Sequence, residues 1–221
     1  MARRSDHSRA ELADLVIAAA RGIAAADGAR AVTMRRIATA VGYVPGSIYN
    51  AVGDLDDVLQ RVNADTLVRL GAALEQAVSD SPSGASGAAG AIATVLRFAG
   101  AYMRFVAAEP HLWAAVIDHP PKPDRVVPEW YAQPRARLIE IGEAAIGPLF
   151  PDLAARRRAV ITLWAALQGV AALTAGGNLR FVLPDGDAAD IARALVLRYL
   201  TGSEDPPGAA PGATLPDGGR S

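Results

Sequence analysis

The sequence contains no cysteine among its 221 residues, and lysine occurs once, as Lys122. The absence of cysteine excludes disulfide bonds, thiolate metal sites and cysteine nucleophiles. Aromatic residues make up only 5% of the chain, whereas alanine and glycine are abundant. The N-terminal residues become polar where an apolar signal region would begin, so we expect no signal peptide and a cytoplasmic protein.

The charge of the chain is nearly balanced, which argues weakly against a nucleic-acid-binding protein. The formal net charge is −1, and residues 1–63 carry eight arginines against seven acids, a net of +1. Domains that bind nucleic acid usually show a clearly basic footprint. Binding to DNA would therefore depend on the local placement of a few arginines and on dimerisation. Apolar residues make up 51% of the chain, which is enough for a buried core.

The stretch 33–49, TMRRIATAVGYVPGSIY, predicts two short helices joined by a tight turn. Ala38 is small enough to let the helices cross closely, and Gly42 tolerates the positive φ of the turn. Pro45 suits the first position of the second helix, and Ile48 falls on its inner face. This pattern is typical of a helix-turn-helix, whose second helix lies in the DNA major groove.

The remaining periodicity predicts an all-α chain without strands. The expected helices are Ser8–Asp27, Thr33–Val41, a third from Pro45 to Gly53, Leu55–Val78, Ala91–Ala108, Pro110–Asp118, Pro134–Phe150, Leu153–Ala175 and Asp187–Leu200. Residues 79–90 and 119–130 are expected to be loops. We expect a DNA-binding domain at 1–54, a helical regulatory and dimerisation domain at 55–202, and a disordered tail at 203–221.

The run Ala159–Ala175 is mostly apolar, with Thr162, Gln168 and Thr174 as its polar residues, and its length is at the lower limit of what is needed to cross a bilayer. A helix that is apolar all round is also typical of a large core or an oligomer interface. We favour the buried helix and expect no contact with a membrane.

The N-terminal region resembles the tetracycline-repressor family of bacterial transcription regulators. The resemblance covers about residues 10–60 and includes VTMRRIATAVG, GSIYNAV and the apolar fourth helix. It implies a three-helix DNA-binding domain, a connecting fourth helix, and an all-helical domain that dimerises and often encloses a ligand. The later segment WAALQG is similar to the Trp…His-Gly signature of one subgroup, with Gln168 in place of the usual histidine.

Three positions depart from the family pattern. Val44 replaces the hydroxyl residue that usually caps the recognition helix, and Pro45 replaces a residue that is often polar or basic. Leu55 stands where a lysine usually contacts phosphate at the start of the fourth helix. Fewer charged contacts predict either weaker DNA binding or more readout by shape and by apolar contact with thymine methyl groups.

The candidate DNA-binding residues lie on the helix-turn-helix, and those of its second helix face outward because Ile48 and Val52 point inward. They are Thr33, Arg35, Arg36, Tyr43, Val44, Pro45, Gly46, Ser47, Tyr49 and Asn50. One of the two arginines is expected to contact phosphate and the other to pair with an acid. The simpler interpretation makes Tyr49 a half-buried aromatic and Asn50 a solvated residue, but the surrounding motif favours contact with DNA. Arg3 and Arg4 form either a DNA-binding arm or a solvated tail.

The candidate ligand-binding residues gather most of the aromatic side chains of the second domain. They are Phe98, Tyr102, Phe105, Trp113, His119, Trp130, Trp164 and Gln168. An apolar pocket between helices is the functional interpretation, and plain core packing explains the same helical spacing. His111 and His119 lack a third metal ligand, and Asp118 with His119 lacks a nucleophile, so we expect no metal, no cofactor and no enzyme activity.

The last two helices carry small and apolar faces that suit pairing with a second copy, although they would also complete a monomeric core. The sequence thus predicts a homodimeric repressor that binds a double-stranded, palindromic DNA operator and is released by a small, mostly apolar effector of unknown identity. The alternative is a ligand-binding or scaffold protein whose helix-turn-helix no longer binds DNA strongly.

Overall fold

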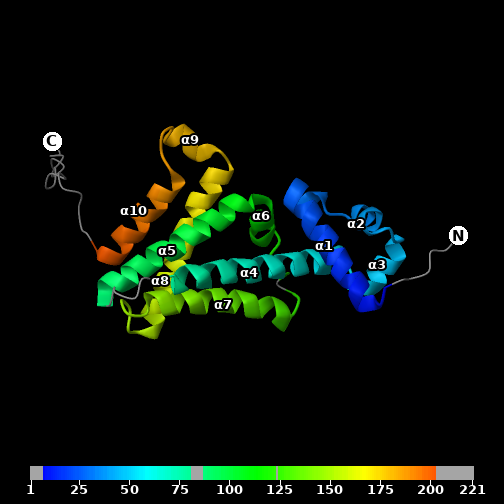
Figure 1. Cartoon of the computed structure of the whole chain (residues 1–221), viewed down its shortest axis with the longest axis horizontal. Coiled ribbons are helices and arrows are strands. Elements are labelled where there is room, and N and C mark those ends of the chain that lie inside the picture. Colours follow the sequence, from blue (N-terminus) through cyan, green and yellow to red (C-terminus); the bar gives the residue numbers. More distant parts are fainter. Residues whose placement is uncertain (1–6, 81–86, 123, 203–221) are drawn as a thin grey trace, which may run out of the picture.

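The computed structural model describes residues 7–80, 87–122 and 124–202, and all regular structure in these ranges is helical (Figure 1). The elements are α1 (Arg9–Asp27), a 3-10 helix η1 (Ala29–Ala31), α2 (Met34–Val41), α3 (Pro45–Val52), α4 (Leu55–Ser79), α5 (Gly87–Ala108), α6 (Pro110–Asp118), α7 (Glu129–Ile146), α8 (Leu153–Ala175), α9 (Asn178–Val182) and α10 (Ala188–Thr201). The all-α prediction is confirmed.

Side-chain hydrogen bonds explain where the helices α1 and α4 begin. The Ser8 side chain accepts from the Glu11 amide while the Glu11 carboxylate accepts from the Ser8 amide, which forms a capping box at the start of α1. Asp54 and Asp57 form the same reciprocal pair at the start of α4. Because these bonds satisfy amides that have no partner within the helix, each of them places a helix start at a definite residue.

Helix α4 contributes to two separate hydrophobic cores. Its N-terminal half packs with α1, α2 and α3 through Val58 and Val62, which are fully buried. Its C-terminal half places Leu70 and Leu74 in a larger core with α5, α7, α8 and α10. The helix therefore passes continuously from the N-terminal three-helix unit into the rest of the protein (Figure 1).

The larger unit is built around α4. Helices α5 and α7 both pack along α4, while α10 packs on α5 and on α8 (Figure 1). The short helix α6 lies between the two units and contacts both α1 and α4. The N-terminal unit thus meets the larger one through α4 and α6.

Three predicted boundaries were wrong. Helix α5 begins at Gly87, inside the expected loop 79–90, and α7 begins at Glu129 and ends at Ile146. The helix starts directly after Pro128, so Pro134 lies inside α7. The sequence prediction placed the start at Pro134 because proline is common at the first position of a helix. Helix α9 and the 3-10 helix were not predicted, since such short segments carry no periodic pattern. The expected tail at 203–221 lies outside the described residues.

Two helices, α5 and α8, are long and apolar enough to cross a membrane by length and composition alone. Both contribute buried residues to the larger core, among them Val95 and Tyr102 from α5 and Leu163 and Leu167 from α8. Core helices of soluble proteins pass the same test, so the finding is weak evidence for a membrane span.

The N-terminal core is expected to be sensitive to the loss of volume. Ile37 of α2 is fully buried, and Ile37→Ala should lower the free energy of unfolding by about 2 to 5 kcal/mol, because a cavity replaces packed methyl groups. Urea denaturation followed by circular dichroism measures the change. Leu153→Ala, at a position that is 63% exposed, is the control and should cost less than about 0.5 kcal/mol. Equal losses in the two variants would contradict the burial of Ile37 in the N-terminal core.

Candidate functional site

The turn between α2 and α3 has the geometry of a helix-turn-helix. Thr33 caps α2, and its hydroxyl accepts from the Arg36 amide at 3.2 Å. Gly42 ends α2 in the left-handed conformation with φ 75°, which a side chain would strain. Pro45 opens α3, and the capping residue Val44 makes no side-chain hydrogen bond there, as expected for a residue without a hydroxyl group.

The outer face of α3 is open to solvent. Ile48 and Val52 are buried, which confirms their inward orientation, while Val44 is 68% and Tyr49 51% exposed. Among the other candidates on the turn and on α3, Pro45, Gly46 and Asn50 are exposed and Ser47 is half-buried. The helix therefore presents an uncharged, partly apolar surface of the kind that could enter a groove.

The two adjacent arginines of α2 have different surroundings. The guanidinium of Arg36 donates to the Asp27 carboxylate at 2.6 Å and to the Ala31 carbonyl, so it is paired with an acid of α1. Arg35 is exposed and forms no ion pair with any residue in the described ranges. Arg35 is therefore the arginine left available for phosphate.

Tyr43 is half-buried, and its hydroxyl lies 2.6 Å from Nδ1 of His7. Arg3 and Arg4 lie outside the described residues.

Three acids at the start of α4 form ion pairs with two cations of the connection between α6 and α7. Arg125 lies 3.2 Å from the carboxylate of Asp54, 3.8 Å from Asp56 and 3.7 Å from Asp57, and Lys122 lies 3.3 Å from Asp56. The pKa of Asp54 is lowered by the hydrogen bond from the Asp57 amide and by Arg125. The hydrogen bond and the charge of Asp54 raise the pKa of Arg125. A segment of the larger unit thus supplies positive charge directly after the recognition helix.

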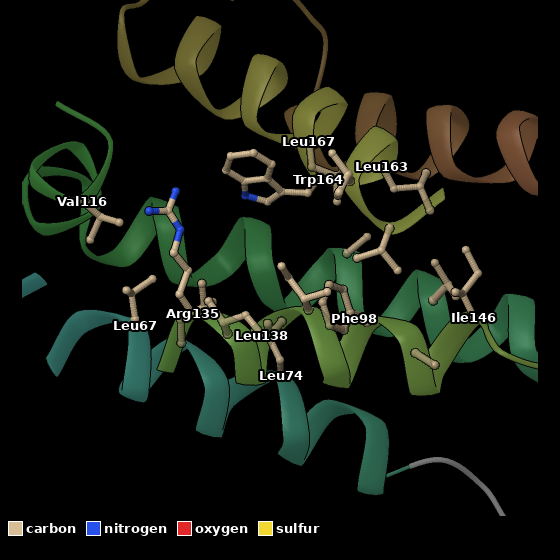
Figure 2. Close-up of a pocket in the computed structure, with 18 of the residues that line it drawn as sticks. Leu67, Leu74, Phe98, Val116, Arg135, Leu138, Ile146, Leu163, Trp164 and Leu167 are labelled. Atoms are coloured by element: carbon tan, nitrogen blue, oxygen red, sulfur yellow. The ribbon is translucent and has the colours of Figure 1, made fainter. Parts of the chain in front are cut away.

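The larger unit contains a cavity of about 430 Å³ between α4, α5, α6, α7 and α8 (Figure 2). Its walls are almost entirely apolar. The lining residues are Leu67, Leu70, Leu74, Val95, Phe98, Ala99, Trp113, Val116, Ile117, Pro120, Arg135, Leu138, Ile139, Gly142, Ala145, Ile146, Val160, Ile161, Leu163, Trp164, Leu167 and Val196. Its volume and composition are typical of a site for a small apolar molecule.

Three of the eight predicted ligand residues, Phe98, Trp113 and Trp164, line this cavity. Tyr102 and Gln168 lie outside the lining and form a polar cluster with Trp113. The Tyr102 hydroxyl donates to Oε1 of Gln168 at 2.6 Å, and the Trp113 indole N–H donates to the same oxygen at 2.8 Å. Burial raises the pKa of Tyr102 far above its usual value. Gln168 therefore holds the cavity wall in place through Trp113 rather than facing the interior.

The other three predicted ligand residues also lie outside the cavity lining. Phe105 packs under the guanidinium of Arg69, and Trp130 packs against that of Arg61 at 4.8 Å from the ring centroid. His119 ends α6, where its carbonyl accepts from the side-chain amide of Asn63. The aromatic character of Phe105 and Trp130 did not identify cavity residues, because the guanidinium groups of two arginines of α4 lie over these rings instead.

Most of the cavity wall was not predicted from the sequence, because aliphatic residues that line a cavity and those that fill a core follow the same periodicity. Arg135, the charged residue of the lining, was not predicted either. The signal available for Arg135 was a basic residue flanked by apolar ones on α7, and such a pattern also describes an ordinary solvated face.

No cluster of metal-ligating residues occurs within the described parts of the chain. His111 instead donates from Nδ1 to the Ala25 carbonyl of α1.

Comparison with known proteins agrees with this architecture. Residues 95–199 match the family described as Tetracyclin repressor-like, C-terminal domain. A protein of unknown function from Rhodococcus sp. RHA1 has a similar fold, with a TM-score of 0.70 and 21% identity over 90% of this chain and 98% of that one. The TetR family transcriptional regulator PfmR from Thermus thermophilus has a TM-score of 0.57 and 20% identity, over 86% and 99% of the two chains. No curated protein matches this chain.

A regulator with a bound ligand also shares the fold. FadR from Bacillus subtilis, solved in complex with stearoyl-CoA, has a TM-score of 0.62 and 11% identity over 86% of this chain and 99% of that chain. At these identities the likeness concerns the fold.

Disruption of the polar cluster of Tyr102, Trp113 and Gln168 should lower the free energy of unfolding. Gln168→Leu keeps the volume but leaves two buried donors without an acceptor, so the free energy of unfolding should fall by about 2 to 4 kcal/mol in urea denaturation. Adding Tyr102→Phe should cost less in this variant than in the native protein, because the hydroxyl has already lost its partner. Additive losses would show that the hydroxyl and Gln168 do not interact.

Proposed function

Because this chain belongs to the tetracycline-repressor family, we propose that it is a transcriptional repressor that a small, mostly apolar ligand releases from DNA. The observation that carries the proposal is the arrangement along α4. An exposed recognition helix precedes its N-terminal end, and its C-terminal half lines the apolar cavity. One rigid helix thus joins a surface suited to DNA with a site suited to a ligand.

In the proposed complex, α3 lies in the major groove of a palindromic operator. Ser47 and Asn50 contact base edges or phosphate, Val44 and Pro45 contact thymine methyl groups, and Arg35 contacts the backbone. The weak charge of the domain makes affinity depend on two half-sites bound together.

The homodimer is proposed to form through α8 and α10. The small-residue face of α8 supports this, since Ala165, Gly169, Ala172 and Leu173 are exposed in the single chain. Ile191 of α10 is half-buried and packs on the larger core.

The proposal also includes the division of the chain into domains at residues 1–54, 55–202 and 203–221. It further includes a cytoplasmic location, and neither membrane contact nor catalysis.

Ligand binding would reach the DNA-binding unit through α4 and α6, which both meet it. Asn63 is fully buried at the junction, and its side-chain amide donates to the carbonyls of Ala115 and His119 at the end of α6. At the other end of α6, His111 is bonded to the Ala25 carbonyl of α1. Since Trp113, Val116 and Ile117 of α6 line the cavity, a ligand that shifts α6 also shifts α1. Release requires only that the ligand bind the shifted state more tightly.

The second candidate, a ligand-binding or scaffold protein that binds DNA weakly, is favoured by Val44, Pro45 and Leu55, which supply no charge or side-chain hydrogen bond where the family usually has one. Selection of bound fragments from a random DNA pool separates the two. An enriched palindrome supports the regulator, and the absence of any enriched sequence supports the scaffold.

Arg35 should carry part of the affinity for the selected DNA. Arg35→Ala should weaken binding roughly tenfold and reduce the slope of log K against log salt by about 2 per dimer, because two phosphate contacts are lost. Fluorescence anisotropy over a range of salt concentrations measures both. Arg104→Ala, which removes the same charge from an exposed position on α5, should leave the slope unchanged. A reduced slope in both variants would indicate a nonspecific effect of net charge.

Arg125 should support DNA binding without touching the recognition helix. Arg125→Ala removes the positive charge beside the carboxylates of Asp54, Asp56 and Asp57 near the expected phosphate path, so DNA affinity should fall roughly threefold to tenfold at low salt and less at high salt. The stability should change by less than about 1 kcal/mol, because these pairs are exposed. Arg137→Ala, which breaks ion pairs with Glu75 and Glu140, is the matched control and should not affect DNA binding. Unchanged DNA affinity in Arg125→Ala would refute this role.

A further inference from the structure

Arg135 is the charged residue in a cavity wall that is otherwise apolar or aromatic. It projects from α7, and its guanidinium lies between Val116 of α6 and Trp164 of α8 (Figure 2). A cation placed beside an apolar cavity is unfavourable unless water or an anion solvates it. Because Arg135 is exposed, water hydrates its guanidinium, and an anionic ligand of the cavity would replace part of that water.

No hydrogen bond or ion pair joins Arg135 to another residue in the described parts of the chain. Its neighbour on the same helix, Arg137, differs sharply. Arg137 contacts Glu75 at 2.8 Å and Glu140 at 3.2 Å. The guanidinium of Arg135 therefore keeps all five donors available for a ligand or for water.

Arg135 stands at the mouth of the cavity. It is exposed to solvent, and so are three apolar residues of the lining, Ile117 at 37%, Ile161 at 46% and Trp164 at 42%. These residues place the opening between α6, α7 and α8. The deeper wall is buried and consists mainly of aliphatic residues such as Leu70, together with Trp113.

We propose that the cavity binds an amphiphile with one anionic head group, a medium-chain or long-chain carboxylate, and that Arg135 recognises the head. The apolar interior favours an alkyl chain, since a polar body would lose its hydrogen bonds to water without replacement. A carboxylate matches the planar fork of a guanidinium and accepts two of its hydrogen bonds. Because the pair forms at the mouth, both charges stay partly hydrated and their desolvation penalty stays small. This inference rests on the proposed function, which makes the cavity the ligand site.

Decanoate, decanol and decylamine provide matched probes, because they share one alkyl chain and differ in the charge of the head. Binding to the full-length protein is measured without DNA, by the fluorescence of the cavity tryptophans Trp113 and Trp164 and by calorimetry, below the micelle concentration. Decanoate should bind roughly tenfold more tightly than decanol, and decylamine more weakly than either. Equal affinities for the three probes would overturn the proposal.

Arg135→Gln tests the residue directly. Decanoate binding should weaken roughly tenfold, while decanol binding stays within about twofold, because only the charged head loses its partner. The control Arg137→Gln removes a cation from the same helix outside the cavity and should change neither affinity. An equal loss for both probes, or no loss for decanoate, would overturn the assignment of Arg135. Thermal melting checks that both variants remain folded.

Release of DNA is a separate readout of the same probes. If decanoate binds through Arg135 but leaves the DNA complex intact, this inference stands and the proposed release mechanism fails. If decanol releases DNA as well as decanoate does, the release mechanism stands and the choice of an anionic head fails.

Discussion

The burial of α4 in two hydrophobic cores is the constraint on which the rest of the structure depends. Val58 and Val62 are held by α1 to α3, while Leu70 and Leu74 are held by α5, α7 and α8. A rigid helix packed at both ends cannot move at one end without disturbing the other. The same helix leads out of the recognition helix and lines the cavity, so the proposed link between ligand and DNA follows from ordinary core packing.

Few of the described charged side chains near α4 are left without an ion pair. In the N-terminal unit, Arg36 is bound to Asp27, which leaves Arg35 exposed beside an uncharged recognition helix. The acids that begin α4 are covered by Arg125 from the larger unit. Among the described residues that line the cavity, Arg135 is the single cation against an apolar wall. In a chain of net charge −1, Arg35 and Arg135 mark the surfaces where an anionic partner is expected.

Much of the helix-turn-helix could be predicted because its signals are local. The cap at Thr33, the left-handed turn at Gly42 and the proline at position 45 each constrain the backbone within a few residues. The cavity was predicted less well. Trp164 and Trp113 were identified, whereas Gln168 and Tyr102 bond to each other behind the wall. Helical periodicity shows which face is apolar, but it does not distinguish a packed face from one that borders a cavity.

The sequence by itself determined the helical fold, the DNA-binding motif and the inward face of α3, because capping, turn geometry and periodicity act over a few residues. Only the tertiary structure decided which arginine stays unpaired, which side chains face the cavity, and that the α6–α7 connection neutralises Asp54. These properties depend on contacts between residues far apart in the chain, such as Arg125 with Asp54 and Trp113 with Gln168. No local pattern encodes such contacts, since they arise only when the helices pack.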